Sequence, residues 1–238
     1  HKVLNIDCDT IIVDSIEPLW NMDMTGKVFG GMLECINDRY RRNIGKNNGD
    51  YYMNGGIIFL NLDDVRAGDY ERKFTEYITK YGSSLAYLDQ DVLNGVVEQD
   101  KKLVLPMRYN VLSIYYYATY EQVRKIRRSK TAFYSKNEYN QAVKNPGLVH
   151  FTTCFLDGLR PWIKGNRHPY LSQFLAYKRM SPWKDMPLQE DQRSSLVKFR
   201  TNLIKKAPRT ALCEVASILH GIVIPEKNYR QMKQKEKE

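Results

Sequence analysis

Short apolar runs recur along the first two thirds of the chain. Residues 2–6, 28–33, 57–60, 103–105 and 148–151 are each rich in Val, Ile, Leu or Phe. Polar residues, glycine or proline bound most of these runs. Runs of this length and character are typical of strands that are buried on both faces. The pattern therefore predicts a sheet that is assembled from short, widely separated strands.

Helical periodicity lies between these runs. Apolar and aromatic side chains recur every three or four positions in residues 65–81, and a second helix is expected from Asp89, as its cap, to residue 97. Residues 39–50 are rich in Asn, Gly and charged side chains, and they predict a loop. Strands that alternate with helices predict an α/β fold with a mostly parallel sheet.

The last quarter of the chain has a different pattern. Helical spacing recurs in residues 192–206 and 209–221, and residues 226–238 are almost all charged or polar, so we expect that tail to fray. We therefore predict a main domain over residues 1–185 and a basic helical extension over residues 186–238.

The composition is that of a globular protein. The chain has 238 residues, of which 42% are hydrophobic, and this is enough for a sizeable core. It shows no apolar run long enough to span a membrane and no basic-then-apolar leader. The four cysteines form no CxxC pair, so we expect neither a zinc cage nor a disulfide framework, and a reducing cytoplasm fits best.

Charge is distributed unevenly along the chain. The formal net charge is +10, yet acidic residues outnumber basic ones before residue 100 and basic residues dominate after it. This indicates a metal-binding side opposed to a phosphate-binding or anionic-surface side, or simply a solvated surface with a basic tail. Two interpretations of the C-terminal helices stay open: peripheral contact with an anionic inner membrane leaflet, through Phe199 and Leu203, or packing on the main domain.

The stretch NIDCDTII, residues 5–12, places Asp7 and Asp9 directly after the first predicted strand. Alternate side chains of a strand share one face, so these carboxylates repel each other unless a cation lies between them. Carboxylates are hard ligands for divalent cations, and an imidazole such as that of His150 would favour Mn²⁺ over Mg²⁺. The alternative is that the two acids are a cap or lie in a solvated loop, and that His150 is a core histidine.

Three further polar clusters allow a functional and a structural interpretation. In YYMNGGIIFLNL, Asn54 precedes two glycines that admit a ligand close to the backbone, or that form a simple turn. In LDQDVLN, Asp89 and Gln90 open a helix, where carboxylates are also ordinary caps. In HFTTCFLDGLRPW, Arg160 offers a cation for a phosphate, or the segment is a structural loop.

In this order, the four segments resemble glycosyltransferase family 8, whose retaining transferases have a GT-A fold and use a nucleotide-sugar. The D-x-D strand, the F-N-A-G-like strand, the D-Q-D-x-L-N segment and the late His before a G-x-x-K-P-W-like loop match over residues 1 to about 165. MSPWKDMPL, residues 180–188, looks like part of the bacterial lipopolysaccharide glucosyl- and galactosyltransferases. The resemblance implies a GT-A-like, Rossmann-related mixed sheet flanked by helices, with a helical appendage.

The resemblance also implies a metal site. Asp7, Asp9 and His150 would be the ligands of Mn²⁺, or of Mg²⁺, against the diphosphate of a UDP-sugar. Arg160 would neutralise the departing diphosphate. The family places its first strands, and residues that contact uracil and ribose, before the D-x-D strand. This chain begins at His1, so the resemblance predicts that part of the sheet and of the nucleotide site lies outside it.

The remaining matched residues are implied to contact the sugar. Glu34, Asn54, Asp89 and Gln90 would hold the donor hexose, glucose or galactose, with Asp89 and Gln90 as the catalytic pair. The acceptor would be a glycan or a lipid-linked oligosaccharide. Retention would follow from double displacement through Asp89 or from front-face attack. Two departures from the family pattern are Gly55 in place of alanine, and a longer loop that ends in Arg rather than Lys.

Two other classes remain as alternatives. IDCDT also resembles the D-x-D-x-T/V of haloacid-dehalogenase phosphatases, which use Mg²⁺, but the threonine falls one position early and the other clusters are left unexplained. EQVRKIRRSK and the tyrosines at 115–117 suggest a nucleic-acid-binding module. An acidic first half would repel a phosphate backbone, so we expect no nucleic-acid partner.

Overall fold

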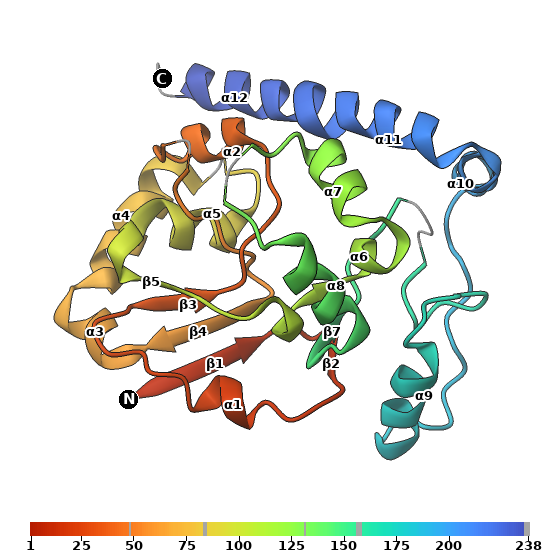
Figure 1. Cartoon of the computed structure of the whole chain (residues 1–238), viewed down its shortest axis with the longest axis horizontal. Coiled ribbons are helices and arrows are strands. Elements are labelled where there is room, and N and C mark those ends of the chain that lie inside the picture. The colour runs from red at the N-terminus through yellow and green to blue at the C-terminus, as the bar shows by residue number, and fades with distance from the viewer. Residues whose placement is uncertain (48, 83–84, 131, 156–158, 236–238) are drawn as a thin grey trace.

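Two small sheets flanked by helices form the core of the molecule (Figure 1). The computed structural model describes residues 1–47, 49–82, 85–130, 132–155 and 159–235. The first sheet has the strand order β1 (Lys2–Ile6), β4 (Ile57–Asn61), β3 (Phe29–Gly31) and β5 (Lys102–Val104). The second has the order β2 (Thr10–Ile12), β7 (Leu148–His150) and β6 (Val111–Leu112).

Helices and short helical turns surround both sheets. They are α1 (Glu17–Trp20), α2 (Asp38–Asn43), α3 (Leu62–Ala67), α4 (Tyr70–Tyr81), α5 (Leu88–Val96), η2 (Gln99–Lys101), η3 (Met107–Tyr109), α6 (Ser113–Tyr117), α7 (Tyr120–Arg127), α8 (Lys136–Lys144) and α9 (Leu171–Met180). Mixed sheets between helices are the architecture that the family resemblance implies.

Both sheets are mixed, so the expectation of a mostly parallel sheet is wrong. β4 lies between β1 and β3 and is antiparallel to both, whereas β3 and β5 are parallel. β7 is antiparallel to β2 and parallel to β6. The direction of pairing depends on which distant strands become neighbours, and a local hydrophobic pattern does not specify this.

Strand β4 is covered on both faces, as its apolar run predicts. Ile57 and Phe59 belong to the main core, whereas Ile58 packs with Tyr70 of α4 and Leu93 of α5. Successive side chains of a strand point to opposite faces, so β4 contributes to two separate hydrophobic clusters. Because both of its faces are packed, β4 is held in place, and the segment before it lies next to α5.

The polar segment that was expected to be a loop, residues 39–50, overlaps helix α2. Asn37 caps this helix, because its side chain accepts a hydrogen bond from the backbone N–H of Arg39 at 2.9 Å. Arg41 is fully buried; it donates to two backbone carbonyls and forms an ion pair with Asp38 at 3.0 Å. The loop expectation is therefore wrong at its start, since a charged side chain is buried with local partners.

The C-terminal segments form one continuous rod after α10 (Ser195–Lys206). The rod consists of α11 (Arg209–Ile218), the π-helical turn η4 (Leu219–Val223) and α12 (Ile224–Lys235). Figure 1 shows it in blue along one edge of the molecule, where it contacts α2 and α7. Ion pairs join Arg39 to Glu226 and Lys125 to Glu214. The expectation of a frayed tail is wrong, because residues 226–235 are helical.

No helix in the described part of the chain combines the length and the apolarity of a membrane-spanning segment. All four cysteines are free thiols. Cys8 is exposed, and the other three are buried.

Candidate active site

The turn between β1 and β2 and the end of β7 bring three metal-ligand side chains together. Asp7 and Asp9 lie in this turn, where the chain passes from one sheet to the other, and Thr10 pairs with His150 across the second sheet. His150 Nε2 lies 3.0 Å from Asp9 Oδ1 and 3.7 Å from Asp7 Oδ2. One ligand atom from each residue lies within 4.8 Å of the others. We call these three residues the acidic cluster.

The acidic cluster fits a single divalent cation. Ligand atoms about 2.1 Å from an octahedral metal lie roughly 3 Å apart when adjacent and about 4 Å apart when opposite, and the distances of 3.0 and 3.7 Å from His150 Nε2 to the two carboxylates fall in this range. The exposed fraction of the side chain falls from 47% for Asp7 to 16% for Asp9 and 6% for His150. A cation here would meet a buried imidazole on one side and solvent on the other. The carboxylates converge because the segment is a turn rather than because they share a strand face.

Burial and charge separate the pKa values of the two carboxyls. Burial alone would raise the pKa of Asp9, but the hydrogen bond and charge of His150 and the guanidinium of Arg160 hold it below its usual value. Burial raises the pKa of Asp7; His150 opposes this rise, and the charges of Asp9 and Asp89 add to it. Asp9, which also forms an ion pair with Arg160, is therefore the more firmly ionised ligand.

His150 has room in the acidic cluster because residue 56 is glycine. A Cβ atom at Gly56 would lie 2.2 Å from His150 Cε1, much closer than side chains approach. The carbonyl of Gly56 also accepts a hydrogen bond from the backbone N–H of Asp7 at 2.9 Å. The NGG segment was interpreted as giving a ligand access to the backbone or as a simple turn. Gly55 and Gly56 do form a turn, and the absence of a side chain at Gly56 also leaves room for the imidazole of His150.

A chain of side-chain hydrogen bonds connects His150 to the predicted sugar residues. His150 Nδ1 lies 2.9 Å from Asn110 Oδ1, Asn110 Nδ2 donates to Asn54 Oδ1 at 2.6 Å, and Asn54 Nδ2 donates to Glu34 Oε2 at 2.6 Å. Because Asn110 Oδ1 can only accept, Nδ1 donates this hydrogen bond, and Nε2 is the ring nitrogen that faces the two aspartates. The sequence reasoning missed Asn110; its only local signal is a polar residue directly before the apolar pair of β6.

The LDQDVLN segment holds the Asn54 segment in place. Gln90 Oε1 accepts a hydrogen bond from Gly55 N–H at 2.7 Å. The side-chain amide of Asn94 bonds both backbone groups of Met53, at 2.8 and 2.7 Å. Two motifs that lie far apart in the sequence therefore form one hydrogen-bonded unit. The pairing of the Asn94 amide with Met53, the residue before Asn54, holds Asn54 where its side chain meets that of Asn110.

Asp89 does not cap helix α5, so that expectation is wrong. Tyr87 occupies the cap position, and its N–H donates to Asp91 Oδ2 at 2.8 Å. Asp91 is buried and also accepts a hydrogen bond from the Tyr52 hydroxyl. Asp89 is exposed, and the pKa of Asp7 responds to its charge.

A pocket of about 330 Å³ lies next to this network. Glu34, Asn54 and Gln90 line it, as their predicted sugar-binding role requires, whereas Asp89 does not. Its other lining residues come from several elements: Ile36, Tyr87, Leu112, Ile114, Ile126, Arg127, Thr152, Thr153, Cys154, Phe155 and His220. Thr153 also accepts a hydrogen bond from Arg160 at 3.3 Å, which links the pocket to the acidic cluster.

The chain matches a known protein family over the region that holds both sites. The profile of glycosyl transferase family 8 covers residues 1–164. The chain belongs to glycosyltransferase family 8. The match includes the acidic cluster and most of the pocket of this family 8 chain, and it confirms the resemblance found in the sequence. It ends before the C-terminal rod.

Individual relatives resemble the family 8 chain at low identity. General stress protein A of Bacillus subtilis is 23% identical over 184 residues, which are 76% of this chain and 60% of that protein. The crystal structure of the galactosyltransferase LgtC with donor and acceptor sugar analogues matches with a TM-score of 0.57 and 23% identity, over 76% of this chain and 62% of LgtC. GlyE of Streptococcus pneumoniae matches at 0.52 and 18%, over 76% and 40%. The chain thus spans about three fifths of the first two relatives.

Proposed function

We propose that the family 8 chain is a retaining glycosyltransferase that moves glucose or galactose from a UDP-sugar to a glycan or lipid-linked oligosaccharide, with Mn²⁺ preferred over Mg²⁺. The observation that carries this proposal is the hydrogen-bonded chain from His150 to Glu34, because it joins a cation site to a polar pocket. Transfer of the sugar needs positive charge next to the leaving diphosphate and fixed polar groups around the sugar. Family membership and the likeness to LgtC support the same reaction class.

In this proposal, the acidic cluster holds the cation, which supplies positive charge to the donor diphosphate when it is bound. The chain adds a second charge of its own. Arg160 forms an ion pair with Asp9, donates to Thr153, and lies 5.2 Å from the centroid of the Trp162 ring. These contacts hold a guanidinium fork at the edge of the cation site, where it can bind phosphate oxygens in pairs.

The pocket supports front-face attack better than double displacement. Among the described residues that line it, Glu34 is the only carboxylate, and Asp89 is not one of these lining residues. The side-chain oxygen of Gln90 accepts a hydrogen bond from the Gly55 N–H, and an amide is a poor nucleophile, so Gln90 is better suited to bind the sugar by hydrogen bonds than to attack it. We infer that the acceptor oxygen attacks the anomeric carbon on the side from which UDP leaves. Glu34, Asn54 and Gln90 would then orient the sugar by hydrogen bonds.

The proposal includes peripheral membrane contact for a lipid-linked acceptor. Helix α10 exposes Leu196, Phe199 and Leu203, at 67%, 60% and 53%, within a basic extension. The double variant Phe199→Ser, Leu203→Ser should reduce co-sedimentation with phosphatidylglycerol vesicles. If the variant sediments as well as the unchanged protein, this face does not contact the membrane.

The deciding experiment is UDP release from UDP-glucose and UDP-galactose by the full natural protein, with and without Mn²⁺. We expect metal-dependent release that Asp9→Asn abolishes, whereas the exposed control Asp185→Asn leaves it unchanged. An aryl phosphate serves as the second substrate. Metal-dependent phosphate release from it, with no UDP release, would support the phosphatase alternative and contradict the proposal.

A further inference from the structure

The pocket has a far wall that combines Phe155, from the HFTTCFLDGLRPW segment, with two residues outside the four matched motifs. Arg127 at the end of α7, Phe155 and His220 line it together with Glu34 and Asn54. The rings of Phe155 and His220 stack, with centroids 5.7 Å apart and an angle of 25° between their planes. His220 belongs to the π-helical turn of the C-terminal rod, outside the residues that the family profile matches. We call Arg127, Phe155 and His220 the far wall.

Arg127 faces the pocket without a partner of its own. Within the described part of the chain, its guanidinium makes no hydrogen bond and no ion pair, and it lines the cavity. Burial opposes its charge, but Tyr87 and Glu34 raise its pKa, so the guanidinium stays charged. Glu34 is already hydrogen-bonded by Asn54. A half-buried guanidinium that forms no ion pair and no hydrogen bond with the described residues is a group that a ligand can compensate.

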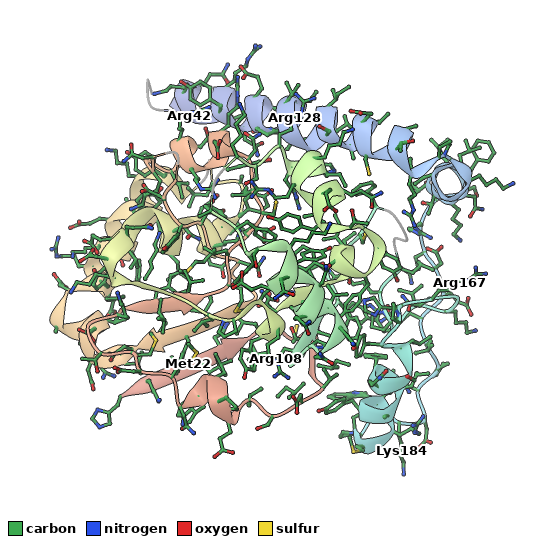
Figure 2. All side chains as sticks on the ribbon, viewed as in Figure 1. Met22, Arg42, Arg108, Arg128, Arg167 and Lys184 are labelled. Atoms are coloured by element: carbon green, nitrogen blue, oxygen red, sulfur yellow. The ribbon has the colours of Figure 1, made fainter. Side chains whose placement is uncertain are left out.

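The far wall is fixed before any ligand arrives. The Asn37 side chain donates to the Gly221 carbonyl at 3.1 Å, and Arg128 Nε donates to Ser217 Oγ at 2.8 Å. A Cβ atom at Gly221 would lie 2.6 Å from Arg128 Cδ, so the turn lies directly on the end of α7. Arg128 is labelled in Figure 2 where α7 meets the rod. A binding surface that is already ordered favours binding, because the protein loses little conformational entropy when the ligand binds.

We propose that the far wall binds an anionic group, a carboxylate or a phosphate, on a sugar that occupies this pocket. A guanidinium fork matches both groups by paired hydrogen bonds. The aromatic stack supplies an apolar face for the ring of the sugar, and Asn54 and Gln90 supply partners for its hydroxyls. That this sugar is a substrate rests on the proposed function, whereas binding of the sugar does not.

The anionic group has two possible sources. It belongs either to the donor, as a nucleotide-linked uronic acid, or to the acceptor, as an acidic glycan unit. UDP release from UDP-glucuronate compared with UDP-glucose tests the donor. Addition of glucuronate-terminated or neutral oligosaccharides in the presence of UDP-glucose tests the acceptor. Arg127 would bind the anionic group in either case. Arg127→Met should therefore abolish the preference for the acidic sugar in whichever of the two tests shows it.

The direct test is binding without metal or nucleotide. Affinities of methyl glucuronide, methyl glucoside and glucose 6-phosphate are measured by ligand-observed NMR. We expect the two anionic sugars to bind at least tenfold more tightly than the glucoside. Arg127→Met should remove this difference, and Arg127→Lys should retain part of it. Arg124→Met, an arginine of the same helix that does not line the pocket, should leave it unchanged.

Two results would overturn the inference. One is equal affinity of the unchanged protein for glucuronide and glucoside, which needs no variant and so does not depend on folding. The other is an unchanged preference in Arg127→Met. Metal-dependent UDP release that shows no preference for acidic sugars would contradict the far wall alone. A preference for acidic sugars with no UDP release would contradict the proposed transfer and keep the binding site.

Discussion

The acidic cluster and the far wall handle charge in opposite ways. In the acidic cluster, Asp9 contacts His150 and forms an ion pair with Arg160, so the charge of this carboxylate is compensated before a ligand arrives. In the far wall, the guanidinium of Arg127 opens into the pocket, and no described carboxylate forms an ion pair with it. The acidic cluster suits a metal ion that binds in the same way whichever substrate is present. The far wall suits discrimination between substrates, because its charge is compensated only by a ligand that carries the matching group.

The largest expected effect comes from breaking the acidic cluster through Gly56. In Gly56→Ala the new Cβ would collide with the His150 ring, so the imidazole must move. We expect Mn²⁺ affinity to fall by roughly 100-fold or more and the free energy of unfolding to fall by about 1 to 3 kcal/mol. Titration of Mn²⁺ followed by electron paramagnetic resonance measures the affinity. Gly82→Ala, at a helix end with right-handed backbone angles, is the control, and unchanged affinity in Gly56→Ala would exclude His150 as a ligand.

A second buried cation, Lys102, sharpens the contrast with Arg127. Its ammonium donates to the carbonyls of Tyr51 and Asn94 at 3.2 and 3.1 Å, and burial lowers its pKa to about 7 from an ordinary 10.5. Between these pH values the unfolded chain binds more protons, so stability should rise with pH, by a few kcal/mol in all. Denaturant unfolding from pH 7 to 10 measures this rise.

Lys102→Met should lose that part of the pH dependence, and the exposed control Lys130→Met should keep it. No charge change occurs at Lys102 below about pH 7, because both states are then protonated, so the two profiles should run parallel there. An identical slope in the unchanged protein and in Lys102→Met would show that this lysine keeps its proton when folded.

A smaller effect is expected from the hydrogen-bonded chain between the two sites. Asn110→Leu removes the partner that orients His150 and leaves Asn54 Oδ1 with one of its two donors, the backbone N–H of Gly56. Loss of such a supporting hydrogen bond typically weakens metal affinity by about 10- to 100-fold. The same Mn²⁺ titration measures it, with the exposed Asn137→Ala as control. If only the stability changes, Asn110 serves packing rather than the orientation of the imidazole.

The smallest effect should come from the surface ion pair that joins the rod to α7. Lys125 and Glu214 are each about half exposed, and such pairs contribute roughly 0 to 1 kcal/mol. Lys125→Met should therefore lower the free energy of unfolding by less than about 1 kcal/mol and leave the preference for acidic sugars intact. A loss of that preference would show that the far wall depends on this ion pair rather than on the packing around Gly221.

The sequence predicted the residues of the acidic cluster because each lies in a recognisable motif. Asp7, Asp9 and His150 come together as expected, since strand ends bring distant segments to one place. Asn110 and Arg127 escaped prediction because their roles depend on packing between elements, and nothing in their neighbouring residues marks it. The assignments of sugar-binding and catalytic residues, and the domain boundary at residue 186, remain predictions.

The errors in the predicted fold also arise from contacts that neighbouring residues in the sequence do not reveal. The helix at Asn37 was missed because Arg41 looks like a surface residue, yet local carbonyls and Asp38 let it be buried. The polar tail is helical because Arg39 binds Glu226 and because α12 packs on α2. Periodicity reports a helix only where one face is apolar, and here a charged helix is held by contacts with a distant element.

The late position of the rod in the chain has a consequence for synthesis on the ribosome. Ile126 packs in a hydrophobic cluster with Cys213 and Ala216 of α11 and with the partly buried Phe155. Ribosomes add roughly 5 to 20 residues per second, so Ile126 leaves the exit tunnel several seconds before the helix that covers it. During that interval the nascent chain presents an apolar patch beside an open pocket. A chaperone that binds the nascent chain should therefore contact α7, and should leave it when α11 docks.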